Sequence, residues 1–172
     1  ILGLMTCLWL ASVILQKASI VDPFWGLGFV MASFYYFSKS DGDSIRQLVV
    51  LSLSALWGLR LFVYLFWRNY GKPEDYRYAQ FRKDYGPHRY WWVSFFQVFL
   101  LQGILLWLIS APLLTSQYYK QAFGWLDVMA ILCWLIGFSF EAGGDYQLTR
   151  FRRNPNNKGR VLNTGFWRYT RH

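Results

Sequence analysis

Apolar residues gather into five long runs along the chain, and shorter polar stretches separate these runs. A helix needs about 20 consecutive apolar residues to cross a bilayer, so runs of this kind predict transmembrane helices. Sustained alternation of apolar and polar residues, which a β-barrel requires, is missing from the sequence. The pattern predicts an all-α, multi-pass transmembrane helical bundle, part of a single membrane domain. The predicted spans cover residues 1–16, 24–38, 47–67, 91–114 and 124–145.

The polar segment 68–90 is long enough to contain structure of its own. It interleaves aromatic residues with arginines and lysines, which between two spans is typical of an amphipathic helix lying at the membrane surface. We expect this helix to begin between Asp75 and Ala79 and to end at Gly86-Pro87. The last apolar run is expected to continue as a helix over 146–153, within a basic tail that covers 146–172.

Two short-range features refine the second and third predicted spans. Small side chains in the second span allow a neighbouring helix to approach closely. Asp43 or Ser44 is suited to cap the start of the third helix. The small residues are Gly26, Gly28, Ala32 and Ser33.

Composition supports a membrane protein. Hydrophobic residues make up 55% of the chain and aromatic residues 22%, well above the apolar share of ordinary soluble domains. The net charge of +9 would suit a nucleic-acid partner, but the long apolar runs between the charge clusters exclude that class. Only two histidines are present, and Cys7 and Cys133 lie apart within apolar runs. We therefore expect no metal site.

The basic residues are distributed unequally between the two predicted sides of the membrane. If five spans alternate sides, most of the 18 lysines and arginines fall on the side of Lys17, the 68–90 loop and the 146–172 tail. The positive-inside rule places that side in the cytoplasm, of either a bacterial inner membrane or an endoplasmic reticulum membrane. The stretch Asp22-Pro23-Phe24-Trp25 should then meet the loop and the tail on one membrane face.

Ionisable residues in the predicted spans are candidates for chemistry, because they are costly there unless they are paired or hydrated. Glu141, Asp145 and Arg152 recur within roughly one stripe of a helix. They could line a ligand pocket, or they could pair locally within a basic membrane anchor. Arg60, Tyr64 and Arg68 also share a face. These three could form a polar pocket with Glu141 or Asp145, or a structural salt bridge between spans.

The tail offers a second kind of chemistry. Its arginines suit the geometry of phosphate groups, and the rings of Trp167 and Tyr169 could stack on a base or a nicotinamide. Anionic lipid headgroups would satisfy the same arginines. The sequence contains no Walker loop, zinc motif or catalytic-triad pattern. A cofactor-dependent membrane enzyme is therefore the sharpest function that the residues favour.

Four segments carry a resemblance that covers nearly the whole chain. They are SIVDPFWGLGF (19–29), RNYGKPEDYRYAQFRKDYG (68–86), SFFQVFLLQG (94–103) and FEAGGDYQLTRFRRNPNNKGRVLNTGFWRYTRH (140–172). They resemble the DUF1295 group of the steroid 5-alpha-reductase-like membrane proteins. The resemblance implies an all-helical membrane reductase that uses NADPH to reduce a carbon–carbon double bond in a steroid-like or other lipid substrate. Because the chain begins without methionine and stops inside the last motif, we expect it to be truncated at both ends.

The resemblance also implies roles for single residues. Asp145 matches a cofactor-contacting aspartate, and Arg152 matches an arginine near the cofactor phosphates. Arg171 and His172 match the Arg-His that opens the terminal motif, and Tyr169 precedes them as expected. Together with Trp167, whose ring could stack on the cofactor, they complete the expected cofactor-binding set. Glu141 stands where the steroid reductases have asparagine, and it is a catalytic candidate. The second catalytic candidate, Tyr64, does not come from the resemblance: its position in the third span and its neighbour Arg60 suggest it as the proton donor.

Two other functions remain open at the level of sequence. A methyltransferase of the isoprenylcysteine carboxyl methyltransferase type has a similar terminal motif but binds S-adenosylmethionine, which carries no phosphate. The many bases of the tail favour NADPH over that ligand. A non-enzymatic membrane protein that binds lipid would show no nucleotide affinity, and it would tolerate the change Asp145→Ala. The oligomeric state is not predicted.

Overall fold

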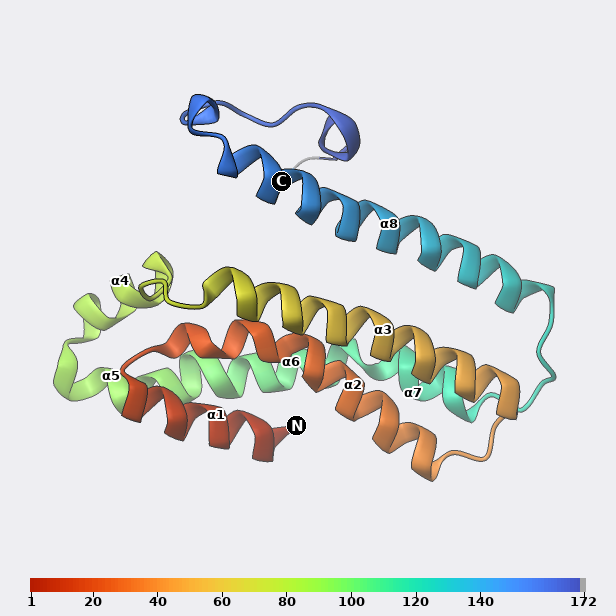
Figure 1. Cartoon of the computed structure of the whole chain (residues 1–172). Coiled ribbons are helices and arrows are strands. Elements are labelled where there is room, and N and C mark those ends of the chain that lie inside the picture. The colour runs from red at the N-terminus through yellow and green to blue at the C-terminus, as the bar shows by residue number, and fades with distance from the viewer. Residues whose placement is uncertain (171–172) are drawn as a thin grey trace. The chain divides into compact units, whose positions relative to one another are not determined.

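The computed structural model describes residues 1–170, and every regular element within them is helical (Figure 1). The fold is therefore all-α, as the apolar pattern predicts. The larger helices are α1 (Leu2–Leu15), α2 (Val21–Lys39), α3 (Ser44–Asn69), α4 (Tyr76–Tyr85), α5 (Pro87–Ser94), α6 (Leu101–Ile109), α7 (Ala111–Tyr118) and α8 (Trp125–Arg153). Short elements complete the list: η1 (Ala18–Ile20), the π-helix η2 (Phe95–Leu100), η3 (Pro155–Asn157) and η4 (Gly165–Arg168).

Three helical stretches in residues 1–170 are long and apolar enough to cross a membrane. They are Ser44–Asn69 with 26 residues, Pro87–Tyr118 with 32 and Trp125–Arg153 with 29. They contain the spans predicted at 47–67 and 91–114, and all but the first residue of the span predicted at 124–145. These helices make the chain an integral, multi-pass membrane protein. The apolar α1 is shorter, and α2 begins at Val21 rather than at residue 24. That α1 and α2 also cross the membrane stays a prediction.

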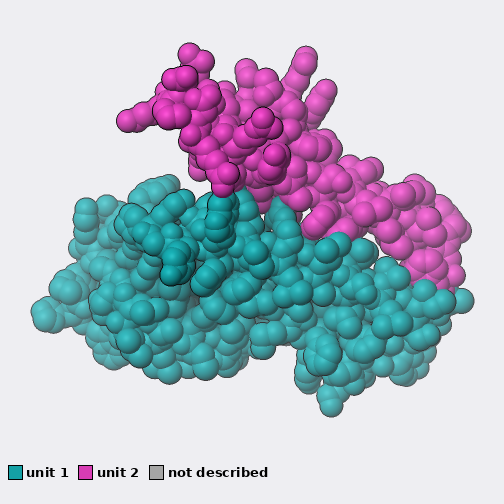
Figure 2. Space-filling view, in the orientation of Figure 1, with its two compact units in different colours: residues 1–122 teal, residues 123–172 magenta. Residues whose placement is uncertain are grey.

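The chain divides into two compact units, which Figure 2 colours separately. Unit 1 covers Ile1–Ala122 and contains α1 to α7, whereas unit 2 covers Phe123–His172 and contains α8 and the basic tail.

Unit 1 is built on a close crossing of α2 and α3. A Cβ atom on Gly26 would overlap the carbonyl oxygen of Gly58, and a Cβ atom on Gly58 would overlap the carbonyl oxygen of Gly26. Gly28 lies against the side chain of Leu106 from α6, and Ser33 is fully buried. The small residues of the second predicted span therefore do allow close helix contact, as expected.

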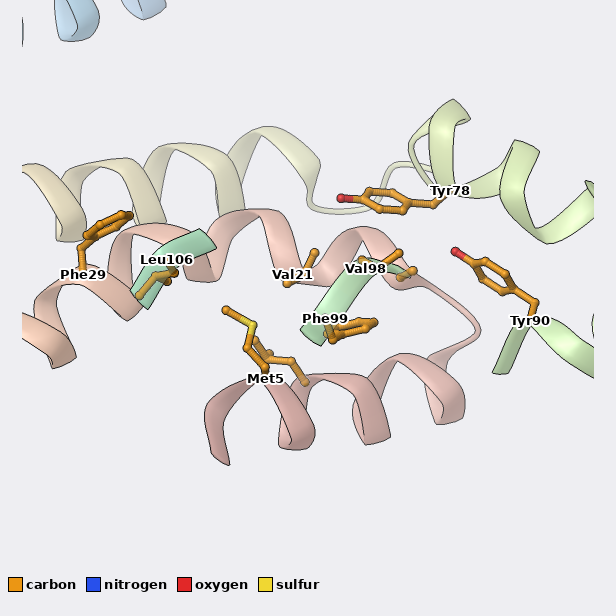
Figure 3. Close-up of a cluster of buried hydrophobic side chains, with 10 residues drawn as sticks. Met5, Val21, Phe29, Tyr78, Tyr90, Val98, Phe99 and Leu106 are labelled. Carbon is orange, nitrogen blue, oxygen red and sulfur yellow. The ribbon is translucent and has the colours of Figure 1, made fainter. Parts of the chain in front are cut away.

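The core of unit 1 lies where α1, α2 and the α5–α6 stretch meet (Figure 3). Met5, Val21, Phe99 and Leu106 are buried almost completely there. Tyr78 from α4 extends this core at one end. The amphipathic segment 68–90 is thus anchored through the inner face of α4, which runs between the expected boundaries and is capped by Asp75.

The predicted span 91–114 is helical but not uniform. Residues Phe95–Leu100 form a π-helix, and Pro112 falls in the first turn of α7, where its missing N–H group removes no helical hydrogen bond. The N-terminus of α3 is capped by Asp43, whose carboxylate accepts a hydrogen bond from the Arg46 amide at 2.9 Å. This agrees with the cap predicted from the sequence.

In unit 2, α8 continues past its apolar part to Arg153, and the predicted helical extension over 146–153 is confirmed. The tail then folds back onto the same helix. The Phe166 amide donates to the side-chain oxygen of Gln147 at 3.0 Å, and the Trp167 indole N–H donates to the Gly144 carbonyl at 2.9 Å. Gly143 leaves room for the ring of Phe166. Unit 2 is therefore one long helix, α8, with the tail folded back against it.

Candidate functional site

A pocket of about 510 Å³ lies within unit 2, between the end of α8 and the returning tail. Its charged lining residues are Arg152, Lys158 and Arg160, and the Trp167 side chain forms part of its wall. Leu148 and Phe151 add apolar surface from α8. This size falls within the range of small-molecule sites, roughly 300–1,000 Å³.

The local sequence explains how the three cations come to line one pocket. Asn154 ends α8, and its side-chain oxygen accepts a hydrogen bond from the Asn156 amide at 3.0 Å. The side-chain amide of Asn157 then donates to the Phe151 carbonyl at 2.9 Å, which ties the turn to the helix. Gly159 has a φ of 78°, a left-handed conformation that glycine adopts without strain, and the chain reverses there.

Chemically, the pocket is suited to a large anion with a flat ring. Guanidinium groups form paired hydrogen bonds to phosphate oxygens, and three cations in the lining favour a ligand with several negative charges. The indole ring of Trp167 is held in place by its hydrogen bond to Gly144, so it offers a fixed apolar face. Unit 2 alone thus combines three cationic side chains with an aromatic surface.

Unit 1 contains the predicted group of Arg60, Tyr64 and Arg68 on α3. The guanidinium carbons of Arg60 and Arg68 lie 5.8 and 5.7 Å from the centre of the Tyr64 ring. The sequence spacing of four residues therefore does bring the two cations against one tyrosine, as predicted. Cations at this distance are attracted to the face of an aromatic ring.

A second polar network in unit 1 joins α2, α4 and α6, and the sequence analysis did not identify it. The Tyr78 hydroxyl donates to the Asp22 carboxylate at 2.7 Å, and the Gln102 side-chain amide donates to the same hydroxyl at 3.2 Å. The Gln102 oxygen accepts from the Trp25 indole N–H. The Gln102 side chain therefore links α6 to both α2 and α4.

Burial controls the electrostatics of this network. Asp22 precedes the predicted span 24–38, and burial raises the pKa of its carboxyl above the usual value for aspartate. The Tyr78 hydroxyl and the Arg77 guanidinium, 3.9 Å away, act in the opposite direction. Burial and the neighbouring Asp22 carboxylate raise the pKa of the Tyr78 hydroxyl far above its ordinary range, so this tyrosine stays protonated.

Residues 8–172 match the family model described as protein of unknown function, DUF1295. The chain belongs to the DUF1295 family. This confirms the family to which the four sequence segments pointed. No match was found for this DUF1295 protein among curated proteins or among solved structures. The family description names no activity, so a function has to be inferred from the site.

The structure brings only part of the predicted cofactor site of this DUF1295 protein together. Arg152 and Trp167 line the pocket of unit 2. Glu141 and Asp145 lie on α8 before the pocket and do not form its wall, and the Tyr169 side chain is 75% exposed outside it. The predicted contacts of Arg171 and His172 lie outside the described residues. Tyr64, the predicted proton donor, belongs to unit 1.

Some residues of the unit 2 pocket and of the Asp22 network could have been assigned to their sites from the sequence. Lys158 and Arg160 were counted among the bases of the tail but were not assigned to the site, although the Asn-Pro-Asn-Asn-Lys-Gly turn indicates a reversal of the chain. Asp22 was expected to meet the 68–90 loop on one membrane face, and its bond to Tyr78 confirms that meeting. The tail belongs to the other unit.

An ion pair within the 68–90 segment of the DUF1295 protein, between Arg82 and Glu74, also connects that segment to the end of α1. Arg82 of α4 donates to both carboxylate oxygens of Glu74 at 3.2 Å and to the Gln16 carbonyl at 3.0 Å. Glu74 also accepts a hydrogen bond from the Ala18 amide at 2.6 Å. Since Arg82 further packs 4.6 Å from the centre of the Tyr90 ring, one arginine joins α1, α4 and α5.

Proposed function

We propose that this DUF1295 protein is a membrane-embedded oxidoreductase that uses NADPH to reduce a carbon–carbon double bond of a steroid-like or other lipid substrate. The observation that carries this proposal is the pocket of unit 2, with Arg152, Lys158 and Arg160 on its wall and Trp167 beside them. The resemblance to the steroid reductases supports the type of reaction, and the apolar helices support an apolar substrate.

The charge of the pocket favours NADPH over S-adenosylmethionine. NADPH carries a pyrophosphate and a third phosphate on its ribose, whereas S-adenosylmethionine carries none. Arg152, Lys158 and Arg160 would hold these phosphates, and the Trp167 ring would pack on a flat ring of the nucleotide. A pocket with three cations would gain little from a ligand that is itself cationic at its sulfonium.

The chemistry divides between cofactor and protein. Bound NADPH would supply a hydride to the β carbon of a double bond conjugated to a carbonyl. The protein then has to stabilise the negative charge that grows on the carbonyl oxygen and to supply a proton. We assign proton donation to Tyr64, whose ring centre lies 5.8 and 5.7 Å from the guanidinium carbons of Arg60 and Arg68. Glu141 and Asp145 remain proposed hydrogen-bond acceptors on α8.

Tyr78 is the less suitable proton donor, although it too carries a hydroxyl in unit 1. Its hydroxyl already donates to Asp22 and accepts from Gln102, and the residue is only 5% exposed. A buried hydroxyl group whose proton and lone pair are both used in hydrogen bonds within the protein stabilises the fold and is not available to a substrate. We therefore assign Tyr78 a structural role.

The proposal is tested by calorimetric titration of the detergent-solubilised protein with NADPH and, separately, with S-adenosylmethionine. We expect NADPH to bind and S-adenosylmethionine to give no heat of binding. Binding of S-adenosylmethionine alone would transfer the protein to the methyltransferases. Binding of neither ligand would contradict both enzymatic functions and leave a lipid-binding membrane protein.

A further inference from the structure

Basic residues from separate parts of the sequence gather in unit 1 at the end of α1, beside α4 and α5 (Figure 1). Arg82 of α4 donates to the Gln16 carbonyl at 3.0 Å, directly after α1 ends. The Lys17 ammonium group donates to the Lys72 carbonyl at 2.6 Å, which brings the segment before α4 to the same place. None of these basic residues lines the pocket of unit 2, so the proposed cofactor site does not use them.

Part of this positive charge has no acidic partner. Lys83 lies in the last turn of α4, and Arg89 lies in the first turn of α5. Both residues are exposed, as is Lys72, and none of the three forms an ion pair within residues 1–170. Asp84 follows Lys83 in the sequence, and its carboxylate accepts a hydrogen bond from the Gln80 side chain at 2.8 Å. This end of unit 1 therefore carries an excess of positive charge.

Exposed apolar side chains adjoin the cations on both helices. Ile14 and Leu15 form the last turn of α1, just before the basic residues begin, and they are 81% and 63% exposed. On α5, Trp91 and Trp92 follow Arg89 closely, and each is about half exposed. Each of the two helices therefore passes from an apolar to a basic surface at the same end of unit 1.

This boundary lies at the depth of the lipid headgroups. Helix α5 begins the 32-residue candidate span Pro87–Tyr118, so its first turns fall at one surface of the membrane. Exposed tryptophans are typical of that depth, where their rings lie among the headgroups. Helix α1 reaches the same level, because the Trp9 indole N–H donates to the Trp91 carbonyl at 2.7 Å. Basic side chains at headgroup depth attract anionic lipids.

We propose that this surface, formed by Ile14, Leu15, Lys83, Arg89 and Trp92, binds an anionic phospholipid in preference to a neutral one. A ligand with a negative head and an apolar tail matches both the cations and the exposed apolar side chains. An acidic protein or a nucleic acid would use the cations alone, and a neutral phospholipid would leave them without a counter-charge. The inference does not depend on NADPH binding, because every residue that carries it lies in unit 1.

The test is native mass spectrometry of the full chain in a neutral detergent, titrated with phosphatidylglycerol or with phosphatidylcholine of equal chain length. The test variant, Lys83→Gln/Arg89→Gln, removes two exposed cations that pair with no acid in residues 1–170. Lys39→Gln/Lys120→Gln is the matched control, because it removes the same charge at the far end of unit 1, where the Tyr118 hydroxyl donates to the Lys39 carbonyl. Lipid bound by the basic tail is common to all three proteins, so differences between them report on this surface.

We expect Lys83→Gln/Arg89→Gln to bind phosphatidylglycerol roughly 5- to 25-fold more weakly than the wild type, and phosphatidylcholine equally well. Lys39→Gln/Lys120→Gln should bind both lipids as the wild type does. Unchanged affinity for phosphatidylglycerol in Lys83→Gln/Arg89→Gln, or an equal loss in the control, would overturn the proposal. Displacement of the lipid by glycerol 3-phosphate or by polyglutamate would overturn it as well, because it would indicate a free anion or an acidic protein as the ligand.

Discussion

The carboxyl group of Asp22 and the hydroxyl group of Tyr78 form a 2.7 Å hydrogen bond across 56 positions of sequence. No local sequence pattern predicts this hydrogen bond, because it depends on how α2, α4 and α6 pack together. Arg152 and Trp167, by contrast, could be predicted, since a charged residue after an apolar helix and an aromatic residue in a basic tail are visible in the sequence. Single residues are thus predictable where their role is local.

The buried carboxyl of Asp22 leads to a prediction of pH dependence. Its pKa in the folded protein is raised, so the folded state binds the proton more tightly than the unfolded state does. The stability that Asp22 contributes is therefore greatest below its unfolded pKa and declines as the pH rises through its folded pKa. Asp22→Asn keeps an acceptor for Tyr78 and cannot ionise. We expect its melting temperature to gain on that of the wild type as the pH rises from about 4 to about 7.

Asp41→Asn serves as the control for this measurement. The hydrogen bond from Lys120 lowers the pKa of the exposed Asp41 carboxyl, so its small contribution is present at neutral pH and is lost as the pH falls. The pH trend of Asp41→Asn relative to the wild type should therefore run in the opposite direction and be weaker. Parallel trends in the two variants would contradict the assignment of the shift to burial of Asp22.

At the scale of elements, the long apolar runs predicted the positions of helices most reliably. Helix α3 and the stretch from α5 to α7 contain two of the predicted spans, α8 contains all but the first residue of a third, and α4 lies within its expected limits. Asp75 and Gly86 supplied local signals for the ends of α4. The π-helix at Phe95–Leu100 was not predicted. Its sequence is as apolar as that of the neighbouring α-helical turns, so only tertiary packing decides between a π-helix and an α-helix here.

The crossing of α2 and α3 leads to a prediction for this scale. Gly58→Ala places a Cβ atom against the Gly26 carbonyl oxygen, so the helices have to move apart, at a cost of about 1–3 kcal/mol. Gly137→Ala is the same change on α8, where the new Cβ atom meets nothing within 4 Å. We expect thermal unfolding in detergent to begin at a lower temperature in Gly58→Ala and at an unchanged or higher temperature in Gly137→Ala. Equal melting of the two variants would refute the close crossing.

At the scale of the whole molecule, composition and hydropathy were sufficient to predict an all-α, multi-pass membrane protein. The unequal distribution of lysine and arginine further predicts a cytoplasmic position for the 68–90 loop and the tail. That cytoplasmic position stays a prediction, whereas the expected meeting of residues 22–25 with the 68–90 loop is seen within unit 1, where Asp22 and Trp25 join the network of Tyr78 and Gln102. The division into two units could not be predicted, because the sequence has no flexible linker near residue 122.

The central claim is that the pocket of unit 2 binds the phosphates of NADPH, and the affinity of NADPH for Arg152→Ala tests it most directly. A charged hydrogen bond contributes about 1.5–3 kcal/mol, so we expect the dissociation constant to rise by roughly 10- to 100-fold. Arg150→Ala removes the same charge from an exposed position of α8 that does not line the pocket, and its affinity should stay close to that of the wild type. Equal affinities for wild type, Arg150→Ala and Arg152→Ala would contradict the account.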